Sequence, residues 1–310
     1  MTESNVETWY VLGAGSLGQL WAALLHRGGR PACLILRTQE RLDEYRKAGG
    51  IMLHEDAEVE RLMPPAVATG PATMRRLLIA TKAHQTMDAL GPYASLRDRS
   101  LAIAILQNGM GAADEAQAAF PKARIYDLVT TTSGWRDAPF TLHRAGHGST
   151  LIGRHGADPR GDDAADVAQS LIVPGLEVIV SPDIRTAQWR KLAVNCVINP
   201  LAALLEILNG QIPTDPRAQK VLGALCTELA AVASAEGVAL TPQDVLASID
   251  STCRVTASNN NSMLQDVRAG RRTEIEYLNG YVLARARTHG IPCPANQALY
   301  DDIRKREGRA

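Results

Sequence analysis

The chain has 310 residues, which is too long for most single hydrophobic cores and predicts two domains, and its 45% hydrophobic content is enough to fill both. Lysine and arginine together number 33, as do aspartate and glutamate, so no basic face indicates nucleic-acid binding and no acidic tail indicates a solvating segment. We therefore expect a globular, soluble protein, monomeric or homodimeric, whose partner is a small molecule.

The cysteines and histidines are arranged unlike those of disulfide-rich or metal-binding proteins. The five cysteines are widely spaced and contain no C-x-x-C pair, and the seven histidines form no H-E-x-x-H or comparable ligand set, so no metal is expected. The polar N-terminus lacks the features of a signal peptide, and no apolar run approaches the roughly 18 to 20 residues of a membrane span. These features predict a cytoplasmic protein that does not contact a membrane.

The first predicted elements are a strand over residues 8–12, a glycine-rich turn, and a helix closed by Gly28 and Gly29. A dinucleotide-binding G-x-G-x-x-G motif requires this strand–turn–helix context. Its first glycine permits the tight turn, the second lets the backbone approach a pyrophosphate, and the third allows close helix packing. The residues of this turn, which we expect to bind the cofactor, are Gly13, Ala14, Gly15, Ser16, Leu17 and Gly18.

A second predicted strand, residues 32–36, ends at Arg37. An NAD site usually carries an acidic residue near this position to bind the ribose 2′-hydroxyl, and residues 33–36 offer none. A guanidinium there can pair with a 2′-phosphate, so the sequence favours NADP(H). The alternative is an ordinary surface arginine.

Two further predicted strands, residues 77–81 and 101–106, end in polar side chains. Lys82 follows the first, and the turn QNGMG, which contains Asn108, follows the second. Because the carboxyl ends of parallel strands form the ligand crevice of an open sheet, both side chains are candidates to contact cofactor or substrate. The alternatives are a solvated strand end for Lys82 and a plain turn at Asn108 and Gly109.

The remaining pattern divides the chain at Pro182, after which strand signals disappear and helical periodicity dominates. We predict an α/β plus all-α protein, with an N-terminal Rossmann-type doubly wound sheet in residues 1–182 and a C-terminal helical domain in residues 183–310. A short connection and a cleft between the domains are expected. Further strands are predicted at 125–131 and 177–180, antiparallel additions around 141–143 and 151–152, and helices at 184–208, 216–236, 242–257, 262–269 and 273–288.

The helical half contains a polar stripe on an otherwise apolar helix. At 3.6 residues per turn, Lys191, Asn195 and Asn199 fall within roughly a quarter of the helix circumference. The alternative is that Lys191 extends to solvent and the asparagines bind neighbouring backbone. Three such residues in register instead predict a lined pocket. Since Pro200 follows Asn199, the helix is expected to kink or end there.

Two more segments of the helical half carry polar groups with ordinary structural alternatives. Thr273 and Glu276 match a capping box, which leaves Glu274 free or in a role as a first-turn acid. Upstream, Asn259 begins a run of amides that ends at Ser262, for which a helix N-cap is the alternative.

The segments GAGSLGQLW, QNGMG, WRKLAVNCVINP and NSMLQDVRAGRRTEIEYLNGY closely resemble ketopantoate reductases, also called 2-dehydropantoate 2-reductases. The resemblance runs from about residue 10 to about residue 294, with the motifs in the family's order. It implies NADPH-dependent reduction of ketopantoate to pantoate, a step towards pantothenate and coenzyme A. By this resemblance Lys191 is the catalytic residue, Arg37 and Lys82 lie near the cofactor, Asn108 and Glu274 contact cofactor and substrate, and Asn195, Asn199, Asn259 and Ser262 line the substrate pocket.

The chemistry of such a pocket agrees with this assignment. Hydride transfer to a ketone builds negative charge on oxygen, which an ammonium can stabilise and protonate. Burial would discharge Lys191 unless an acidic neighbour or an anionic substrate holds its proton. The other hypotheses are a reductase of another branched 2-oxo acid and a non-enzymatic dinucleotide sensor, for which the glycine turn would suffice.

Overall fold

The computed structural model describes residues 7–156 and 163–308, and the chain forms two compact units. The first comprises Met1–Gln107 and Ala112–Ile184, and the second Asn108–Gly111 and Arg185–Ala310. The second unit therefore takes its main part from the region expected to be helical. It also takes four residues from within the expected N-terminal domain.

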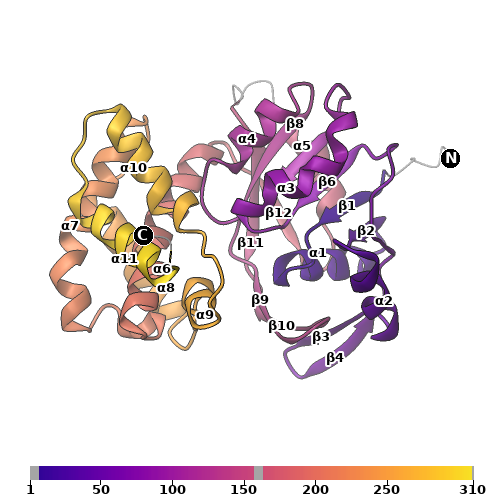
Figure 1. Cartoon of the computed structure of the whole chain (residues 1–310), viewed down its shortest axis with the longest axis horizontal. Helices are drawn as coiled ribbons and strands as arrows, with labels where there is room; N and C mark the ends of the chain where they lie inside the picture. Colours follow the sequence, from indigo (N-terminus) through magenta and orange to yellow (C-terminus); the bar gives the residue numbers. More distant parts are fainter. Residues whose placement is uncertain (1–6, 157–162, 309–310) are drawn as a thin grey trace. The chain divides into compact units, whose positions relative to one another are not determined.

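The first unit is built on an eight-stranded sheet in the order β12-β11-β8-β7-β6-β1-β2-β5 (Figure 1). Its strands from β8 to β5 are parallel, whereas β11 runs antiparallel to β8, as expected for the segment around residue 151. The strand predicted at 177–180 forms the edge. The strands are β1 (Trp9–Leu12), β2 (Ala32–Ile35), β5 (Ala66–Val67), β6 (Arg76–Ile79), β7 (Ala102–Ile105), β8 (Arg124–Thr130), β11 (Ser149–Arg154) and β12 (Glu177–Val180).

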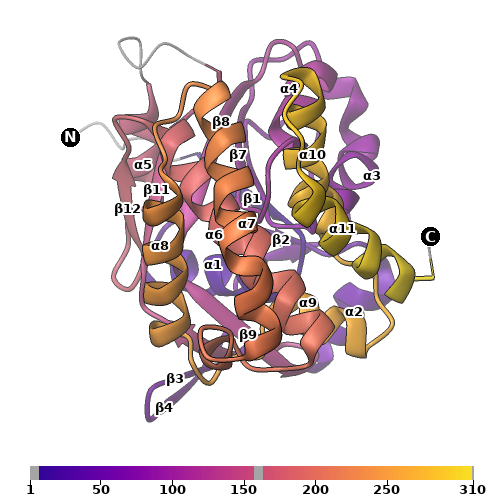
Figure 2. The ribbon, with the colours of Figure 1, turned by 90° about the vertical axis from the view of Figure 1, so that its left-hand side faces the viewer.

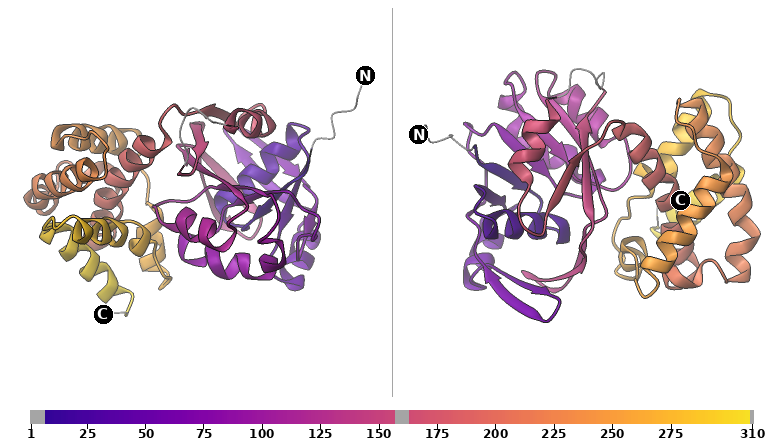
Figure 3. Two further views of the ribbon diagram at one scale, coloured as in Figure 1. Left: turned by 90° about the horizontal axis from the view of Figure 1, so that it is seen from above. Right: turned by 180° about the vertical axis from the view of Figure 1, so that it is seen from behind.

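Helices cover both faces of this sheet because its central strands are apolar on both sides (Figures 1 and 3). Val11 of β1 packs with α1 and α5, and its neighbour Leu12 packs with α3, α4 and the 3-10 helix η2. This is the doubly wound arrangement that the sequence predicts. The helices are α1 (Ser16–Arg27), α2 (Gln39–Lys47), η1 (Ala83–Gln85), α3 (Thr86–Leu90), η2 (Gly91–Leu96), α4 (Ala112–Ala119) and α5 (Ala164–Leu171).

A second, four-stranded sheet with the order β4-β3-β10-β9 was not expected (Figure 1). It consists of β3 (Ile51–Glu55), β4 (Glu58–Leu62), β9 (Ser133–Ala138) and β10 (Thr141–Gly146). The segment around residue 141 is antiparallel to its neighbour β9, but both strands belong to this small sheet. One face is buried, since Leu53 and Leu142 join the core that contains α1.

The second unit is helical (Figure 2), and within it α7 contacts α8, α10 and α11. The expected helix over 273–288 is divided into a 3-10 helix and α10, and α11 was not predicted. No helix within the described residues has both the length and the apolar character needed to cross a membrane. The elements are α6 (Ile184–Leu205), η4 (Asn209–Gln211), α7 (Pro216–Ala235), α8 (Pro242–Val255), α9 (Ser262–Arg268), η5 (Ile275–Tyr277), α10 (Asn279–Thr288) and α11 (Pro294–Arg306).

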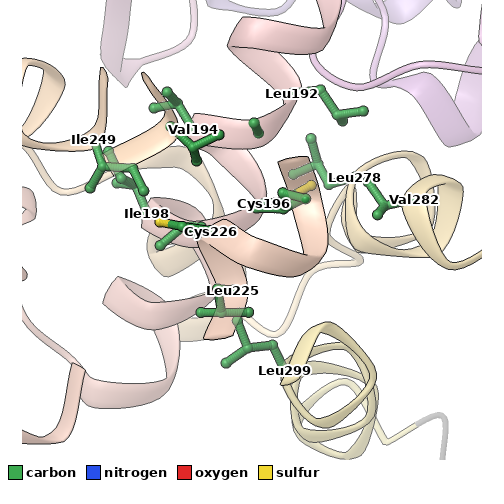
Figure 4. Packing of buried hydrophobic residues seen from close by; sticks show 14 of the residues in the cluster. Leu192, Val194, Cys196, Ile198, Leu225, Cys226, Ile249, Leu278, Val282 and Leu299 are labelled. Carbon is green, nitrogen blue, oxygen red and sulfur yellow. The ribbon is translucent and has the colours of Figure 1, made fainter. Parts of the chain in front are cut away.

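Most of the circumference of α6 is buried. Figure 4 shows Leu192, Val194, Cys196 and Ile198 of this helix among apolar side chains of α7, α8, α10 and α11. All five cysteines are buried free thiols, and four of them, Cys196, Cys226, Cys253 and Cys293, lie in this core. The buried side of α6 therefore shares one apolar core with α7, α8, α10 and α11.

The sequence suggested that this helix would kink or end at Pro200, but α6 continues to Leu205. Proline has no N–H, so the carbonyl of Cys196, four residues earlier, lacks its usual helical donor. The side-chain amide of Asn279, at the start of α10, donates to this carbonyl at 3.0 Å and also to Oδ1 of Asn296 at 3.0 Å. A tertiary hydrogen bond thus satisfies the carbonyl that the proline leaves unpaired.

Asn279 is itself held in a buried chain of polar contacts. Asn296, in the first turn of α11, donates its side-chain amide to Glu228 of α7 at 2.9 Å. The same carboxylate accepts the backbone N–H groups of Ala295 and Asn296, at 2.8 and 2.9 Å. Asn279 and Asn296 are fully buried, so each contact replaces water that these polar groups would otherwise require.

We predict that Asn279→Ala lowers the free energy of unfolding by about 1 to 3 kcal/mol, because it leaves two buried acceptors without their donor. Pro200→Ala restores an N–H to the Cys196 carbonyl and should recover part of that loss in the double variant. Urea denaturation of the wild type, both single variants and the double variant measures this coupling. An equal cost of Asn279→Ala with and without Pro200 would contradict the assignment of Asn279 to that carbonyl.

Candidate functional site

Two glycines of the turn between β1 and α1 are required by the packing of the chain itself. Gly13 has a φ of +112°, and a Cβ there would lie 2.7 Å from the backbone nitrogen of Thr81. A Cβ on Gly18 would lie 1.8 Å from the Gly13 carbonyl oxygen. The glycine-rich loop therefore approaches both the start of α1 and the end of β6 as closely as the motif requires.

Gly15 differs from these two glycines. Its φ is −71°, and a Cβ would come no closer than 3.7 Å to the nearest atom, the carbonyl oxygen of Ala80. The surrounding protein would thus tolerate a side chain. Gly15 is also the N-cap of α1 and provides no side-chain hydrogen bond to the first N–H groups of the helix. A position without close contacts, beside N–H donors at a helix N-terminus, fits a diphosphate group.

The two cationic candidates of the first unit follow the carboxyl ends of their strands, as this turn follows the carboxyl end of β1. Arg37 is exposed just beyond β2, and Lys82 is half-buried just beyond β6. Because β1 lies between β6 and β2, the turn emerges between the two cations. Gln107, to which the sequence analysis gave no role, joins the ends of β6 and β7 by donating to the Thr81 carbonyl at 2.9 Å.

Asn108 lies in the segment Asn108–Gly111, which we call the strap, and which belongs to the second unit. The N–H of Met110 donates to the carbonyl of Tyr277 at 2.9 Å. Gly109 has a φ of +88°, and a Cβ there would lie 2.2 Å from the same carbonyl oxygen. Gly109 is therefore required by close contact with η5. The strap brings Asn108 to the unit that carries Lys191 and Glu274.

The polar stripe lies on α6 as predicted. Lys191 and Asn195 are half-buried and Asn199 is 8% exposed, whereas the intervening Leu192, Cys196 and Val197 are buried apolar residues. Two turns of helix separate the amine from the second asparagine, which is about 12 Å of axis. The stripe therefore offers a line of polar groups long enough for both ends of a small organic acid.

Lys191 and Glu274 interact electrostatically within this unit. Burial lowers the pKa of the Lys191 ammonium to about 8, and the negative charge of Glu274 limits the decrease. Glu274 precedes η5, and its carbonyl accepts the N–H of Tyr277 at 3.0 Å. The amine is therefore still mostly protonated at neutral pH, yet close enough to its pKa to release a proton readily.

The predicted capping box at Thr273 is wrong. The Thr273 hydroxyl accepts the N–H of Ile275 at 3.2 Å, but Glu276 does not reach back, because its carboxylate accepts the Tyr300 hydroxyl at 2.6 Å and pairs with Arg304 at 3.1 Å. These partners come from α11, which the sequence analysis did not predict. Glu274 is half-buried beside the short 3-10 helix, and its charge acts on Lys191.

The loop before α9 contains Asn259 and Ser262, and its anchor is a residue that was not singled out. Asn261, rather than Ser262, is the N-cap of α9, and its Oδ1 accepts the N–H of Leu264 at 3.0 Å. Its amide donates to Oδ1 of Asn209 at 3.0 Å and to the Ile198 carbonyl of α6 at 3.4 Å. Ser262 is thus exposed without a capping role, and the loop is tied to α6 next to Asn199.

Comparison with known proteins shows what these motifs belong to. Residues 183–307 match the family model described as "Ketopantoate reductase PanE/ApbA C terminal", and residues 9–157 match "Ketopantoate reductase PanE/ApbA". The chain belongs to the ketopantoate reductase family. It is 36% identical over 304 residues to a 2-dehydropantoate 2-reductase of Salmonella typhi, covering 96% of this chain and 94% of the relative.

Solved structures agree over almost the whole chain. A ketopantoate reductase of this family from Ralstonia eutropha JMP134 has a TM-score of 0.85 and 26% identity, covering 97% of this chain and 99% of that one. A complex of D-mandelate dehydrogenase with NADH has a TM-score of 0.84 and 26% identity, with the same coverage. The family is one of pyridine-nucleotide oxidoreductases, and the predicted Rossmann-type sheet followed by a helical unit is confirmed.

We predict that Glu274→Gln moves the alkaline limit of activity to lower pH. The Lys191 pKa of about 8 includes a contribution from the Glu274 charge, and neutralising that charge lowers the pKa further. For carbonyl reduction kcat/KM should fall above about pH 8 in the wild type, as the ammonium is lost, and from a lower pH in the variant. Profiles of kcat/KM against pH measure the shift, and coincident alkaline limbs would contradict it.

Proposed function

We propose that this chain catalyses the NADPH-dependent reduction of ketopantoate to pantoate, a step towards pantothenate and coenzyme A. The observation that carries the proposal is a half-buried lysine whose pKa lies near 8, held on one face of α6 with two carboxamides and opposed by Glu274. Membership of the ketopantoate reductase family supports the same reaction. A cytoplasmic enzyme, monomeric or homodimeric, is part of this proposal.

Lys191 is the proposed general acid. NADPH, when bound, supplies the hydride that reduces the ketone carbon. As that carbon becomes tetrahedral, negative charge develops on its oxygen, and the Lys191 ammonium stabilises the charge and transfers one proton to it. The product is the secondary alcohol, and the neutral amine regains its proton from solvent. Glu274 limits the fall in the Lys191 pKa, so that the ammonium is present before the reaction begins.

The remaining polar residues of the helical unit are proposed to bind the substrate. The carboxamides of Asn195 and Asn199 follow the amine along α6 and suit the carboxylate and hydroxyl groups of a small hydroxylated acid. The substrate-binding set is Asn108, Asn195, Asn199, Asn259, Ser262 and Glu274, and Asn108 and Glu274 are also proposed to contact the cofactor.

The proposed cofactor preference rests on Arg37. It is exposed at the end of β2, where the chain offers no acidic residue to bind a ribose 2′-hydroxyl. A guanidinium at this position can form a charge-assisted pair with the 2′-phosphate of NADPH. The turn residues Gly13 to Gly18 and Lys82 complete the proposed cofactor site.

A reductase of a different 2-oxo acid is the second candidate. The similarity to D-mandelate dehydrogenase favours considering it, because that enzyme shares this fold and was solved with NADH. The lysine and asparagine set would serve any such carbonyl, whereas contacts to the substrate hydroxyl would select ketopantoate. NADPH oxidation measured with ketopantoate, 2-oxoisovalerate and pyruvate distinguishes the two, and equal kcat/KM for the first two substrates would contradict selection through the hydroxyl.

We predict that Lys191→Ala lowers kcat by about 10²- to 10⁴-fold, the usual contribution of general acid–base catalysis. NADPH affinity and thermal stability should stay close to wild type, because the substitution removes an amine without opening the apolar core. Lys191→Arg keeps the charge but not the compact ammonium or its pKa, and it should recover little activity. Near-normal kcat in Lys191→Ala would remove lysine from the mechanism.

We predict that Arg37→Ala weakens NADPH binding by about ten- to a hundredfold, since it removes a charge-assisted hydrogen bond to the 2′-phosphate. The affinity for NADH should be nearly unchanged, because NADH lacks that phosphate. Titration of the quenching of tryptophan fluorescence by each nucleotide gives both dissociation constants. Equal losses for the two nucleotides would mean that Arg37 supports the fold rather than the phosphate.

A further inference from the structure

We propose that Arg136, on β9 of the small sheet, is a cofactor-binding residue that contacts the diphosphate of the pyridine nucleotide. This inference rests on the proposed function, because it requires that a dinucleotide binds at the turn between β1 and α1. It assigns a role to the small sheet, which neither the glycine motif nor the strand pattern of the sequence indicates.

Arg136 reaches the glycine turn directly. One Nη atom of its guanidinium donates to the carbonyl oxygen of Ala14, the second residue of the turn, at 3.0 Å. The same oxygen accepts the side-chain amide of buried Gln19 at 2.8 Å. Gln19, on α1, and Arg136, on β9, thus both donate a hydrogen bond to this carbonyl. The guanidinium therefore binds the residue that precedes Gly15, and at Gly15 the backbone leaves room for a ligand.

The register of the small sheet directs Arg136 to this position. In the pairing of β9 with β10, Arg136 lies opposite Leu142, whose side chain is buried in the core with α1. The preceding residue, Trp135, lies opposite His143 on the other face, and their rings stack with centroids 4.1 Å apart. Because successive side chains of a strand point to opposite faces, this stacking helps fix Arg136 on the side of α1.

The electrostatics of the turn suit a bound anion. The N-terminus of a helix carries a partial positive charge, which acidic residues usually complement, and the first turn of α1 contains none. Arg136 adds a full positive charge beside the same turn. A diphosphate at the helix N-terminus would lie close to both positive groups, and a guanidinium is well shaped to bind its oxygens.

Arg136 and Arg37 should act on different parts of the nucleotide. Arg37 lies at the end of β2 and is proposed to recognise the 2′-phosphate, which only NADPH has. Arg136 lies at the turn and would bind the diphosphate, which NADPH and NADH share. The first residue therefore determines cofactor choice, and the second determines affinity for either cofactor.

Two fragment probes separate these roles: ADP, which carries the diphosphate, and adenosine 2′-monophosphate, which carries the 2′-phosphate. We expect Arg136→Ala to raise the dissociation constant of ADP by about ten- to a hundredfold and to leave that of adenosine 2′-monophosphate unchanged. Arg37→Ala should show the opposite pattern. NADPH and NADH should lose affinity equally in Arg136→Ala. Isothermal titration calorimetry with the full chain measures all four ligands.

Arg61→Ala is the matched control, because Arg61 is an exposed arginine of the same small sheet that also donates to a backbone carbonyl, that of Ala48. It should leave ADP binding unchanged. Arg136→Lys keeps a positive charge and should retain part of the ADP affinity.

Three results would overturn the assignment. If Arg136→Ala binds ADP as tightly as the wild type does, the only role of Arg136 is its hydrogen bond between β9 and the turn. If Arg136→Ala loses affinity for both probes and its ligand-free form has a lower melting temperature, the role of Arg136 is purely structural. An equal loss of ADP affinity in Arg61→Ala would lead to the same conclusion. If wild type binds neither NADPH nor NADH, the proposed function fails instead, so the two failures are distinguishable.

Discussion

A positively charged amine on a helix that is buried around most of its circumference is the constraint on which the second unit depends. Removing the Lys191 ammonium from water favours its neutral form and lowers its pKa to about 8. Glu274 supplies the opposing charge. Its position is held by η5, whose last residue, Tyr277, binds the strap through a backbone hydrogen bond. Several separate segments are therefore needed to keep one proton on one nitrogen.

The same helix has a second problem, which concerns its backbone. Pro200 leaves the Cys196 carbonyl without a helical donor in a fully buried environment, where an unpaired polar group is costly. Asn279 satisfies it, and Asn296 and Glu228 in turn orient Asn279. Because this chain of contacts joins α6, α7, α10 and α11, the helices that pack around the stripe are connected by directional bonds as well as by apolar contacts. Directional bonds specify one arrangement more strictly than apolar packing alone.

Local patterns in the sequence predicted those parts of the protein in which neighbouring residues determine the structure. The glycine turn, the edge strand β12 and the stripe on α6 follow from short-range spacing, and each lies where it was expected. The capping box at Thr273 was wrong, because α11, far along the chain, supplies the partner of Glu276. Of the kink or end expected at Pro200, the end does not occur, and a residue of α10 supplies the donor that the proline lacks. The hairpin of β3 and β4 was missed, since β4 is mostly exposed and charged and lacks the apolar alternation of a buried strand. The roles of individual site residues remain predictions.

The strap has a consequence for how this protein can be divided. Its four residues are bounded on both sides by chain that belongs to the first unit, yet Met110 packs against the core of the second. The chain therefore passes between the units three times, and no single cut separates them. A gene fragment encoding residues 185–310 would lack the segment that pairs with Tyr277 and would lose Asn108 with it. The helical unit is thus not a module that recombination or truncation can transfer intact, and any exchange of it between relatives must carry the strap as well.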